Sequence, residues 1–230
     1  MALRKFKKGS NMYEWVTHGH THLGGECSHK CKYCYVDNPI GGRSPRYSGP
    51  VRLLEEELEV PYHAGKVIFI EHMNDLFAAD VPDEFIKRII AHTVVFPYNT
   101  YVFQTKNPQR MLHWQKFMPK ECILGTTIET NREMDISEAP SPFFRYQAMK
   151  NVPKEFKRFL TIEPVLDFDV NEFAKWIGEI NPDYINLGAD SKNHNLPEPT
   201  VEKVMELVEV LHGLGVELRE KSNLERLKQK

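Results

Sequence analysis

Three cysteines stand close together in the first part of this 230-residue chain, and their spacing favours inorganic chemistry. Cys27, Cys31 and Cys34 are separated by three and then two residues. A loop of this size can direct three thiolates at one metal centre. Structural zinc sites close with four protein ligands, whereas a four-iron four-sulfur (4Fe-4S) cluster on three thiolates leaves one iron free. The three thiols therefore predict a metal centre with an open coordination position.

The remaining cysteine and the hydropathy of the chain indicate where such a protein would work. Cys122 begins a predicted strand, at the end away from the ligand face, where a lone thiol is usually part of the core. The cysteines form no disulfide framework, which is typical of a reducing compartment. The chain lacks any run of about 18 apolar residues, and no apolar segment follows its basic start. We therefore expect a cytoplasmic protein with no membrane span.

The composition is that of a globular protein with a balanced charge. Apolar residues make up 41% of the chain and charged residues 27%. With 30 Lys and Arg against 32 Asp and Glu, the net charge is −2. A net charge this small creates no field that would attract nucleic acid or an anionic membrane to the whole surface. Any such partner must be held by a local site.

Short β-branched or aromatic runs recur along the chain, and most are followed by a helical stretch. The predicted strands are 12–16, 67–70, 100–103, 123–128, 159–162, 184–187 and 216–218, and the predicted helices are 51–58, 82–95, 108–114, 143–149, 170–180 and 201–211. From residue 67 onward, consecutive strands start 23 to 36 residues apart, which is the spacing of βα units rather than of hairpins. The pattern therefore predicts an α/β fold with a parallel sheet.

The length of the chain limits which parallel α/β fold it can form. We expect one domain over residues 1–230, with 1–11 and 222–230 as peripheral tails. A complete eightfold barrel needs about 250 residues, so a partial (β/α)6-type barrel fits better, with an open doubly wound sheet as the alternative. In either fold the ligands lie at the carboxyl ends of the strands. The segment 17–35, with its cysteines, would lie at that edge.

The cysteine loop resembles the cluster motif of the radical S-adenosylmethionine (SAM) superfamily. The pattern Cys-x-x-x-Cys-x-aromatic-Cys is matched at every position, with Tyr33 as the aromatic residue. The string 31–35 is similar to that of the spore photoproduct lyase branch. Residues 73–77, 104–108 and 162–164 resemble a phage-associated, functionally uncharacterised branch of the same superfamily. The resemblance covers about residues 15–221.

The resemblance implies a fold, two cofactors and a reaction class. It implies a partial (β/α) barrel in which Cys27, Cys31 and Cys34 ligate a 4Fe-4S cluster and SAM binds the free iron. Reductive cleavage of SAM would give a 5′-deoxyadenosyl radical that abstracts hydrogen from a substrate. An electron donor such as flavodoxin or ferredoxin is implied as a partner. The likeness to spore photoproduct lyase favours nucleic acid or a nucleotide as the first substrate to test.

Residues after the second and third predicted strands are candidates for the cofactor's amino acid end. The superfamily usually receives the amino group of SAM on a Gly-Gly-Glu-like stretch, but this chain has residues 71–75 there, and the Met73 backbone with Asn74 or Asp75 would substitute. The alternative role of Asn74 and Asp75 is simply to start a loop. Lys106 would pair with the cofactor carboxylate or with an anionic substrate, or would be a solvated loop lysine. Tyr33 is counted with this group because of its place in the cluster motif.

Three further candidates follow the later strands. Glu129 resembles the superfamily's acceptor for the ribose hydroxyls of SAM, the alternative being a surface charge. Glu163 ends a buried run, where a carboxylate contacts a ligand or pairs with a cation such as Lys106 or Lys221. Gly188 would let the backbone approach the adenine ring, or would only form a turn.

Two other functions explain part of the sequence. The alternation of His18, His20 and His22 would suit a divalent metal in a hydrolase built on an α/β barrel. The three cysteines would instead form a zinc knuckle if one of these histidines or His29 completed the site. With the basic residues near both ends of the chain, such a knuckle would suit a nucleic-acid-binding adaptor.

Overall fold

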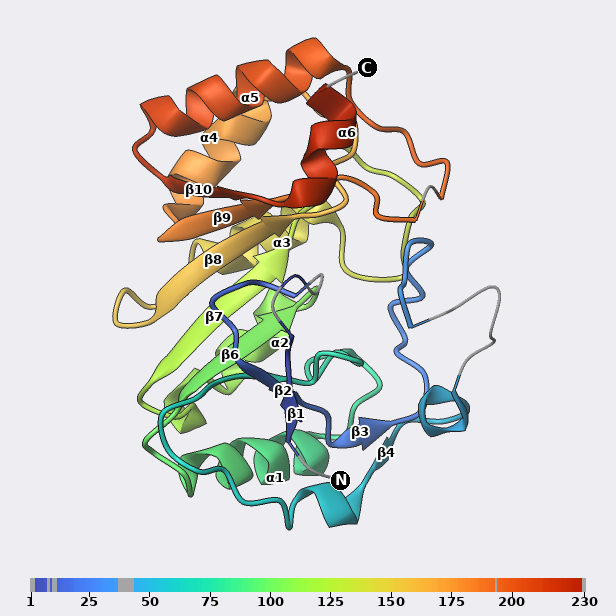
Figure 1. Ribbon diagram of the computed structural model, residues 1–230, viewed down its shortest axis with the longest axis vertical. Coiled ribbons are helices and arrows are strands. Elements are labelled where there is room, and N and C mark those ends of the chain that lie inside the picture. The colour runs from blue at the N-terminus through green and yellow to red at the C-terminus, as the bar shows by residue number, and fades with distance from the viewer. Residues whose placement is uncertain (1–2, 8, 10–11, 37–43, 193, 229–230) are drawn as a thin grey trace.

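A single curved sheet organises the chain in the computed structural model, which describes residues 3–7, 9, 12–36, 44–192 and 194–228. Its strand order is β1-β2-β5-β6-β7-β8-β9-β10 (Figure 1). The strands are β1 (Arg4–Lys5), β2 (His18–His20), β5 (Val67–Ile70), β6 (Thr100–Thr105), β7 (Cys122–Thr127), β8 (Lys157–Ile162), β9 (Tyr184–Leu187) and β10 (Glu217–Glu220). Every pair is parallel except β1 with β2. The sheet does not close, because β1 and β10 are its two ends. The fold is thus the predicted partial barrel.

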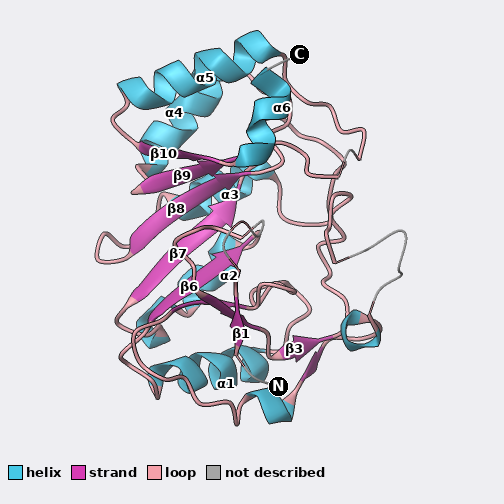
Figure 2. Ribbon diagram, in the orientation of Figure 1, coloured by secondary structure: helices cyan, strands magenta, loops and turns pink. Residues whose placement is uncertain are grey.

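The helices cover the outer face of this sheet, as Figure 2 shows. They are α1 (Asp83–Val94), α2 (Pro108–His113), α3 (Pro142–Met149), α4 (Val170–Ile180), α5 (Val201–Gly213) and α6 (Glu225–Lys228). The side chain of Asn107 accepts a hydrogen bond from the backbone N–H of Arg110, with Pro108 at the first helical position. Thr200 caps α5 in the same way through Lys203. The predicted helix starts at 108 and 201 are therefore confirmed.

Two layers of apolar side chains hold the sheet from its two faces. On β5, Ile68 and Ile70 pack in the cluster that includes the α1 residues Ile89 and Ile90. Phe69, between them, points to the other face and joins Val16, Val102, Phe159 and Tyr184 inside the barrel. Strands buried on both faces have no polar alternation, which is why they appear in the sequence as continuous apolar runs.

Two predicted elements are wrong. Residues 12–16 are not a strand: the first parallel strand is β2 (His18–His20), and Tyr13 and Trp15 instead pack against the inner aromatic cluster. Residues 51–58 are not an α-helix. They form β4 (Arg52–Leu53), paired with β3 (Leu23–Gly24), and a short 3₁₀ helix (Glu55–Glu57). Pairing with the segment before the cysteine loop overrides the weak helical preference of this stretch.

Described residues near both ends of the chain contact the rest of the fold. Arg4 and Lys5 form β1 at the edge of the sheet. Near the other end, Leu224 and Leu227 are buried in the outer cluster beside α5. The physical reason is amphipathicity, since both leucines lie on the covered side of a segment whose charged residues face out. Residues 1, 2, 8, 10, 11, 229 and 230 lie outside the described part of the chain.

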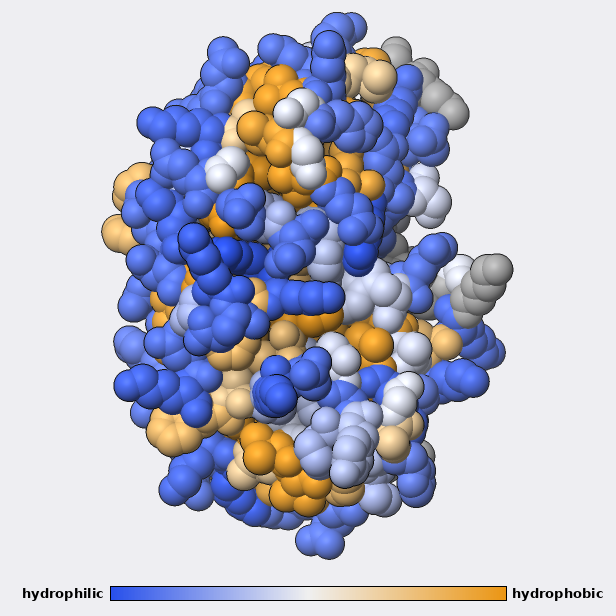
Figure 3. Space-filling view, turned by 90° about the vertical axis from the view of Figure 1, so that its left-hand side faces the viewer, coloured by the Kyte–Doolittle hydropathy of each residue, from blue (hydrophilic) through white to orange (hydrophobic). Residues whose placement is uncertain are grey.

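The surface at the start of the strands is mostly hydrophilic. Figure 3 shows this side, with hydrophobic groups gathered in separate patches near its top, its middle and its bottom. None of the helices in the described ranges has both the length and the apolar character of a membrane span.

Candidate active site

The cysteine loop begins at a glycine that no other residue could replace without strain. Gly25 has a φ of +88°, and a Cβ atom there would lie 2.1 Å from the carbonyl oxygen of Pro50. Its N–H donates to the carbonyl of Arg46 at 2.8 Å. The chain therefore turns from β3 into the cysteine loop at a point where its backbone packs closely against residues 46–50. This places the loop along the edge where the strands end (Figure 1).

The three thiols line one small pocket. The residues around it are Gly25, Cys27, Lys30, Cys31, Cys34, Val36, Tyr47 and Met73. Burial raises the pKa of Cys27 to about 12, with a further contribution from the carboxylate of Asp75, and burial also raises the pKa of Cys31. Thiols in this setting stay protonated unless a cationic centre binds them as thiolates. The donor set therefore fits a metal cluster.

The lining of this pocket favours a cluster over a single zinc ion. Its described lining residues include three cysteines and no histidine. A structural zinc ion needs four protein ligands, whereas a cubane cluster binds three thiolates on three different irons and leaves the fourth iron open. Three thiols without a fourth ligand thus suit the cluster better than a zinc knuckle.

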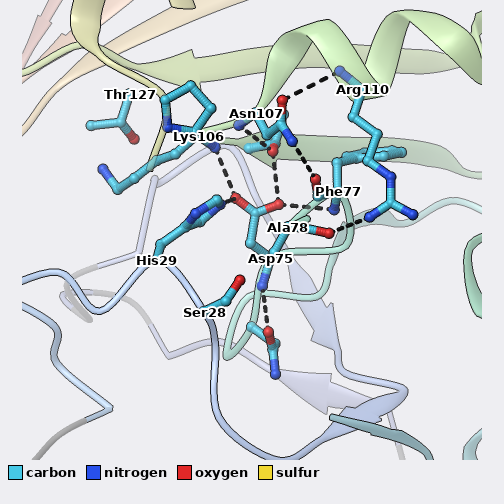
Figure 4. A network of polar contacts seen from close by, with 12 residues as sticks. Ser28, His29, Asp75, Phe77, Ala78, Lys106, Asn107, Arg110 and Thr127 are labelled. Atoms are coloured by element: carbon cyan, nitrogen blue, oxygen red, sulfur yellow. Dashed lines mark hydrogen bonds and ion pairs between the residues drawn. The ribbon is translucent and has the colours of Figure 1, made fainter. Parts of the chain in front are cut away.

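A buried carboxylate ties the cysteine loop to the strand ends. Oδ2 of Asp75 accepts hydrogen bonds from His29 Nε2 and the backbone N–H of Lys106, both at 2.8 Å. Its Oδ1 accepts from Thr105 Oγ1 at 2.7 Å and from the backbone N–H of Phe77 at 2.9 Å (Figure 4). Asp75 therefore connects the loop after β5, the end of β6 and the cysteine loop.

The same contacts keep Asp75 ionised. Burial alone would raise its pKa, but the charge of His29 and the hydrogen bonds from His29, Lys106 and Thr105 hold the pKa below its usual value. His29 is committed to this carboxylate and lies with its ring turned toward it (Figure 4). It does not complete a zinc knuckle with the three thiols.

A second buried carboxylate gathers two cations and a tyrosine. Oε1 of Glu129 lies 2.5 Å from Lys106 Nζ, and its Oε2 lies 2.8 Å from Arg145 Nη1. Tyr33 donates its hydroxyl proton to Glu129, and Lys106 Nζ lies 2.6 Å from the Tyr33 oxygen. Three of the predicted cofactor residues, Tyr33, Lys106 and Glu129, are thus brought together beside the cysteine loop.

The electrostatics of this group favour an ionised Glu129. Burial opposes ionisation, but the nearby Arg145 and Lys106 cations outweigh it and lower the pKa of Glu129 to about 2. Burial, together with the charge of Glu129, raises the pKa of Tyr33 well above its usual value. Both oxygens of Glu129 already accept hydrogen bonds from this chain. Its contact with ribose hydroxyls stays a prediction that requires one of these donors to be exchanged.

The two candidates after β5 lie at the cysteine pocket in different ways. Met73 lines the pocket with the thiols. The Asn74 amide donates to the Gly25 carbonyl at 3.2 Å, and its oxygen accepts from the backbone N–H of Asp75 at 2.8 Å. Asn74 therefore braces the start of the cysteine loop. A contact of either residue with the amino group of SAM stays a prediction.

The last two candidates form a separate group at the ends of β8, β9 and β10. Glu163 lies 2.8 Å from Lys221 Nζ and accepts a hydrogen bond from the Asn223 amide at 2.9 Å. A Cβ atom on Gly188 would lie 2.9 Å from Asn223 Oδ1 and 3.1 Å from Glu163 Cδ. The ion pair with Lys221 was one of the two roles expected for Glu163. The absence of a side chain on Gly188 is what makes room for it.

Several residues of the site have no clear signal in the sequence. Tyr13 reaches across the barrel, donating to Gln104 Oε1 at 2.9 Å and lying 2.6 Å from Thr161 Oγ1. Arg145 lies in α3 between aromatic residues and is only 1% exposed. A buried arginine implies a buried carboxylate partner, and that signal alone could have linked Arg145 to Glu129. Nothing in the sequence marks Tyr13 as an interior residue.

The histidines of the alternating motif do not act together. His18 contacts Thr17, and the cluster that forms contains His20, His22 and His92 from α1. Burial lowers the pKa of these three rings to about 4, 3 and 4 respectively. Their exposed fractions are 4%, 0% and 9%, so no substrate has access to them. The hydrolase expected from His18, His20 and His22 is therefore not supported.

The basic residues near the carboxyl end are engaged within the chain. Arg219 lies over the ring of Tyr184, 3.7 Å from its centroid. Arg226 pairs with Glu198, and Lys228 pairs with Glu220. These contacts weaken the expectation of a basic patch for a nucleic-acid adaptor.

The fold is similar to those of spore photoproduct lyase and SuiB. Spore photoproduct lyase, in a structure with bound SAM and dinucleoside spore photoproduct, superposes with a TM-score of 0.62 at 11% identity, covering 95% of this chain and 80% of that one. SuiB of Streptococcus suis, bound to its precursor peptide SuiA, gives 0.61 at 10% identity, covering 89% of this chain and 48% of SuiB. The chain itself belongs to the family described as protein of unknown function (DUF5131), which matches residues 12–195. No curated protein matches the sequence.

Proposed function

We propose that this chain is a radical SAM enzyme whose Cys27, Cys31 and Cys34 hold a 4Fe-4S cluster. The observation that carries the proposal is the position of these thiols, which line one pocket at the carboxyl edge of a partial barrel with no histidine among its described lining residues. When bound, the cluster and SAM would supply radical chemistry that abstracts hydrogen from the substrate.

The residues around the thiols would bind and orient SAM. Lys106 follows β6 and contacts Tyr33 of the cysteine loop, and it would pair with the cofactor carboxylate, exchanging part of its contact with Glu129. Met73 lines the same pocket, Asn74 donates to the carbonyl of Gly25, another lining residue, and these two residues would receive the amino group. Glu129 would accept the ribose hydroxyls, while Arg145 keeps its charge balanced.

The group at the ends of β8, β9 and β10 would hold the other end of the cofactor. Gly188 lies buried beside Glu163 and Asn223, so the adenine ring would reach its backbone only if one of these side chains moved. Lys221 keeps Glu163 in place. Closing this site matters because water and stray hydrogens would otherwise quench a primary radical.

We further propose a nucleic acid or a nucleotide as substrate and a flavodoxin or ferredoxin as electron donor. The substrate class is supported by the shared fold with spore photoproduct lyase, which was solved with a dinucleoside photoproduct. The local string 31–35 supports it too, since it resembles the lyase branch. The cytoplasmic location expected from the free thiols is compatible with such partners.

The decisive experiment is anaerobic reconstitution with iron and sulfide. The wild-type chain should bind about four iron and four sulfide ions and, with dithionite and SAM, should form 5′-deoxyadenosine. Cys27→Ala, Cys31→Ala and Cys34→Ala should each lose both properties. Cys122→Ala is the matched control, because Cys122 is buried in the outer cluster and should leave both unchanged.

Two results would contradict the proposal. One is a reconstituted chain that contains iron but forms no 5′-deoxyadenosine. The other is a single zinc ion bound by the three thiols. The substrate class is tested separately with perdeuterated oligonucleotides and nucleotides, since deuterium should appear in 5′-deoxyadenosine only with the correct class.

A further inference from the structure

A cluster of three histidines and a tyrosine lies between the sheet and α1, outside the candidate active site. His20 ends β2 and is in register with Ile70, whose side chain faces the outer cluster. His22 follows two residues later, His92 comes from α1, and Tyr62 comes from the segment before β5. One ring nitrogen of each histidine lies within 4.8 Å of those of the other two. Three distant parts of the chain therefore meet here.

The inner atoms of this cluster converge on one point. His22 Nε2 lies 3.0 Å from His92 Nδ1. The Tyr62 hydroxyl oxygen lies 2.5 Å from His20 Nδ1 and 3.1 Å from His22 Nε2. Ligands about 2.0–2.1 Å from a tetrahedral metal ion lie about 3.3–3.4 Å from one another. The four atoms need only small shifts to surround an ion.

The outer nitrogen of each ring is held by an acceptor. His20 Nε2 lies 2.8 Å from Glu57 Oε2, and His22 Nδ1 lies 2.7 Å from Glu71 Oε1. His92 Nε2 lies 3.0 Å from the carbonyl oxygen of Val60. Metal-binding histidines almost always donate their second N–H to a carboxylate or a backbone carbonyl, which fixes the tautomer. All three rings show this arrangement.

The hydrogen-bond partners of the three rings determine which ring nitrogens carry protons. The Val60 carbonyl only accepts, so His92 Nε2 carries its proton and a neutral His92 has a lone pair on Nδ1. If Glu57 and Glu71 accept in the same way, His20 and His22 also direct lone pairs inward. Tyr62 has one hydroxyl proton for its two contacts. The lone pairs of His22 Nε2 and His92 Nδ1 then face each other at 3.0 Å with no proton between them, which is repulsive. A cation bound between these nitrogens removes the repulsion.

The backbone conformation of Glu71 is a second observation that supports a ligand site in this cluster. Its φ of +60° is rare for a residue with a side chain, and such conformations persist where the surroundings fix them. This backbone lets Glu71 accept the backbone N–H groups of His22 and Leu23, at 2.7 and 3.1 Å. The strained residue thus orients the ring of His22 and the chain that follows it.

We propose that His20, His22 and His92, with the Tyr62 hydroxyl at the fourth corner, bind one structural zinc ion. Imidazole nitrogens suit zinc, and a closed four-ligand arrangement is typical of its structural sites. None of the four residues is more than 9% exposed, which leaves no open position for a substrate. The ion would join the start of the cysteine loop, the segment before β5, and α1. It is independent of any cluster on the cysteines.

The test uses the full-length chain without an affinity tag, carrying Cys27→Ala, Cys31→Ala and Cys34→Ala so that only the histidine site remains. After removal of metals with a chelator, this parent should take up one zinc per chain by elemental analysis. Co²⁺ should give the visible bands of a tetrahedral complex, and zinc should raise the melting temperature. Because the thiols are absent, the result does not depend on radical chemistry.

Matched variants locate the ion. His92→Gln should weaken Co²⁺ binding by more than 100-fold, whereas His63→Gln should bind as the parent does, since His63 is an exposed histidine next to Tyr62 in the chain. Glu57→Gln should weaken binding by about 10- to 100-fold through the orientation of His20.

Three outcomes would overturn the proposal. The first is a folded parent that binds no metal, which would mean that a proton shared with Glu71 fills the centre instead. The second is one equivalent of metal retained by a folded His92→Gln variant. If His92→Gln does not fold, the Glu57→Gln variant is used instead. The third contradicting outcome is a Co²⁺ affinity of Glu57→Gln that equals that of the parent.

Discussion

His29 Nε2 donates a 2.8 Å hydrogen bond to Oδ2 of Asp75, and this contact fixes the cysteine loop to the sheet. His29 lies between Cys27 and Cys31, so the direction of both thiols depends on a carboxylate in a different loop. Asp75 in turn is held by the end of β6 through Thr105 and Lys106. Asp75 is therefore a buried side chain that connects the ends of the strands to the middle of the cysteine loop.

Asp75→Asn should loosen this connection. The amide keeps the shape but places an N–H group against one of the donors, so we expect the cluster-free chain to lose about 2–4 kcal/mol of unfolding free energy. Urea unfolding measures this loss, and iron per chain after reconstitution should fall. Asp80→Asn is the control, because Asp80 contacts the cysteine loop at Ser28 from an exposed position. Equal losses in both variants would show that Asp75 has no special role.

Lys106→Ala should weaken SAM binding while leaving the cluster in place. Glu129 keeps Arg145 as a partner, so the chain should still fold. Loss of a charge-assisted hydrogen bond worth about 1.5–3 kcal/mol raises the dissociation constant for SAM by about 10- to 100-fold. Titration calorimetry of the reconstituted protein measures it. Lys150→Ala, which removes a lysine paired with Glu179, should bind SAM normally. An unchanged affinity for Lys106→Ala would remove this lysine from the cofactor site.

The ionisation of Glu129 should make stability depend on pH. Its pKa falls from 4.5 to about 2 on folding, which corresponds to about 3 kcal/mol of stability. Because the folded pKa is the lower one, this contribution is complete above pH 4.5 and is lost as the pH falls toward 2. The stability difference between the wild type and Glu129→Gln, both cluster-free, should therefore shrink with acidification. Urea unfolding between about pH 3 and 6 follows it. A difference that stays constant would mean that Glu129 is not ionised in the fold.

Gly188→Ala should disturb the Glu163 group. The new methyl would lie within 3.1 Å of Glu163 and Asn223, so one of them must move. We expect a loss of about 1–3 kcal/mol and weaker SAM binding, measured by thermal unfolding and calorimetry. Gly178→Ala is the matched control, since its methyl would meet only Leu214 at 3.8 Å inside α4. That substitution should stabilise the chain by about 0.5–1 kcal/mol. Identical effects at the two positions would contradict this interpretation.

The sheet could be predicted from the sequence because its strands are buried on both faces. Runs such as 159–162 and 184–187 contain almost no surface-facing positions, so their apolar character is continuous. The helix starts at Asn107 and Thr200 were predictable because capping depends on neighbours in the chain. The segment 12–16 was not, since its alternating aromatic residues look like a strand although they pack inside the barrel without strand partners.

The candidate site could be predicted only where its residues form a short motif or directly follow a predicted strand. The cysteine loop, Lys106 and Glu129 follow from motif and strand ends. The partners that complete the site come from tertiary contacts: Arg145 reaches Glu129 from α3, and Asn223 reaches Glu163 from 60 residues away. The histidine cluster shows the same limit, because His92 lies 70 residues from His22. Residue type alone does not tell which distant side chains will meet.

The aromatic residues inside the barrel have a consequence for how the protein is made. Tyr13 contacts Thr161, 148 residues away, and Trp15 packs edge-on against Tyr184 and under Arg219. On the ribosome, residues 13 and 15 emerge long before these partners are translated, so the interior cannot consolidate until β10 has left the exit tunnel. Contacts so distant in sequence slow folding and leave aromatic surface open to chaperones. The inner face of the sheet is thus completed only after the last strand has been made.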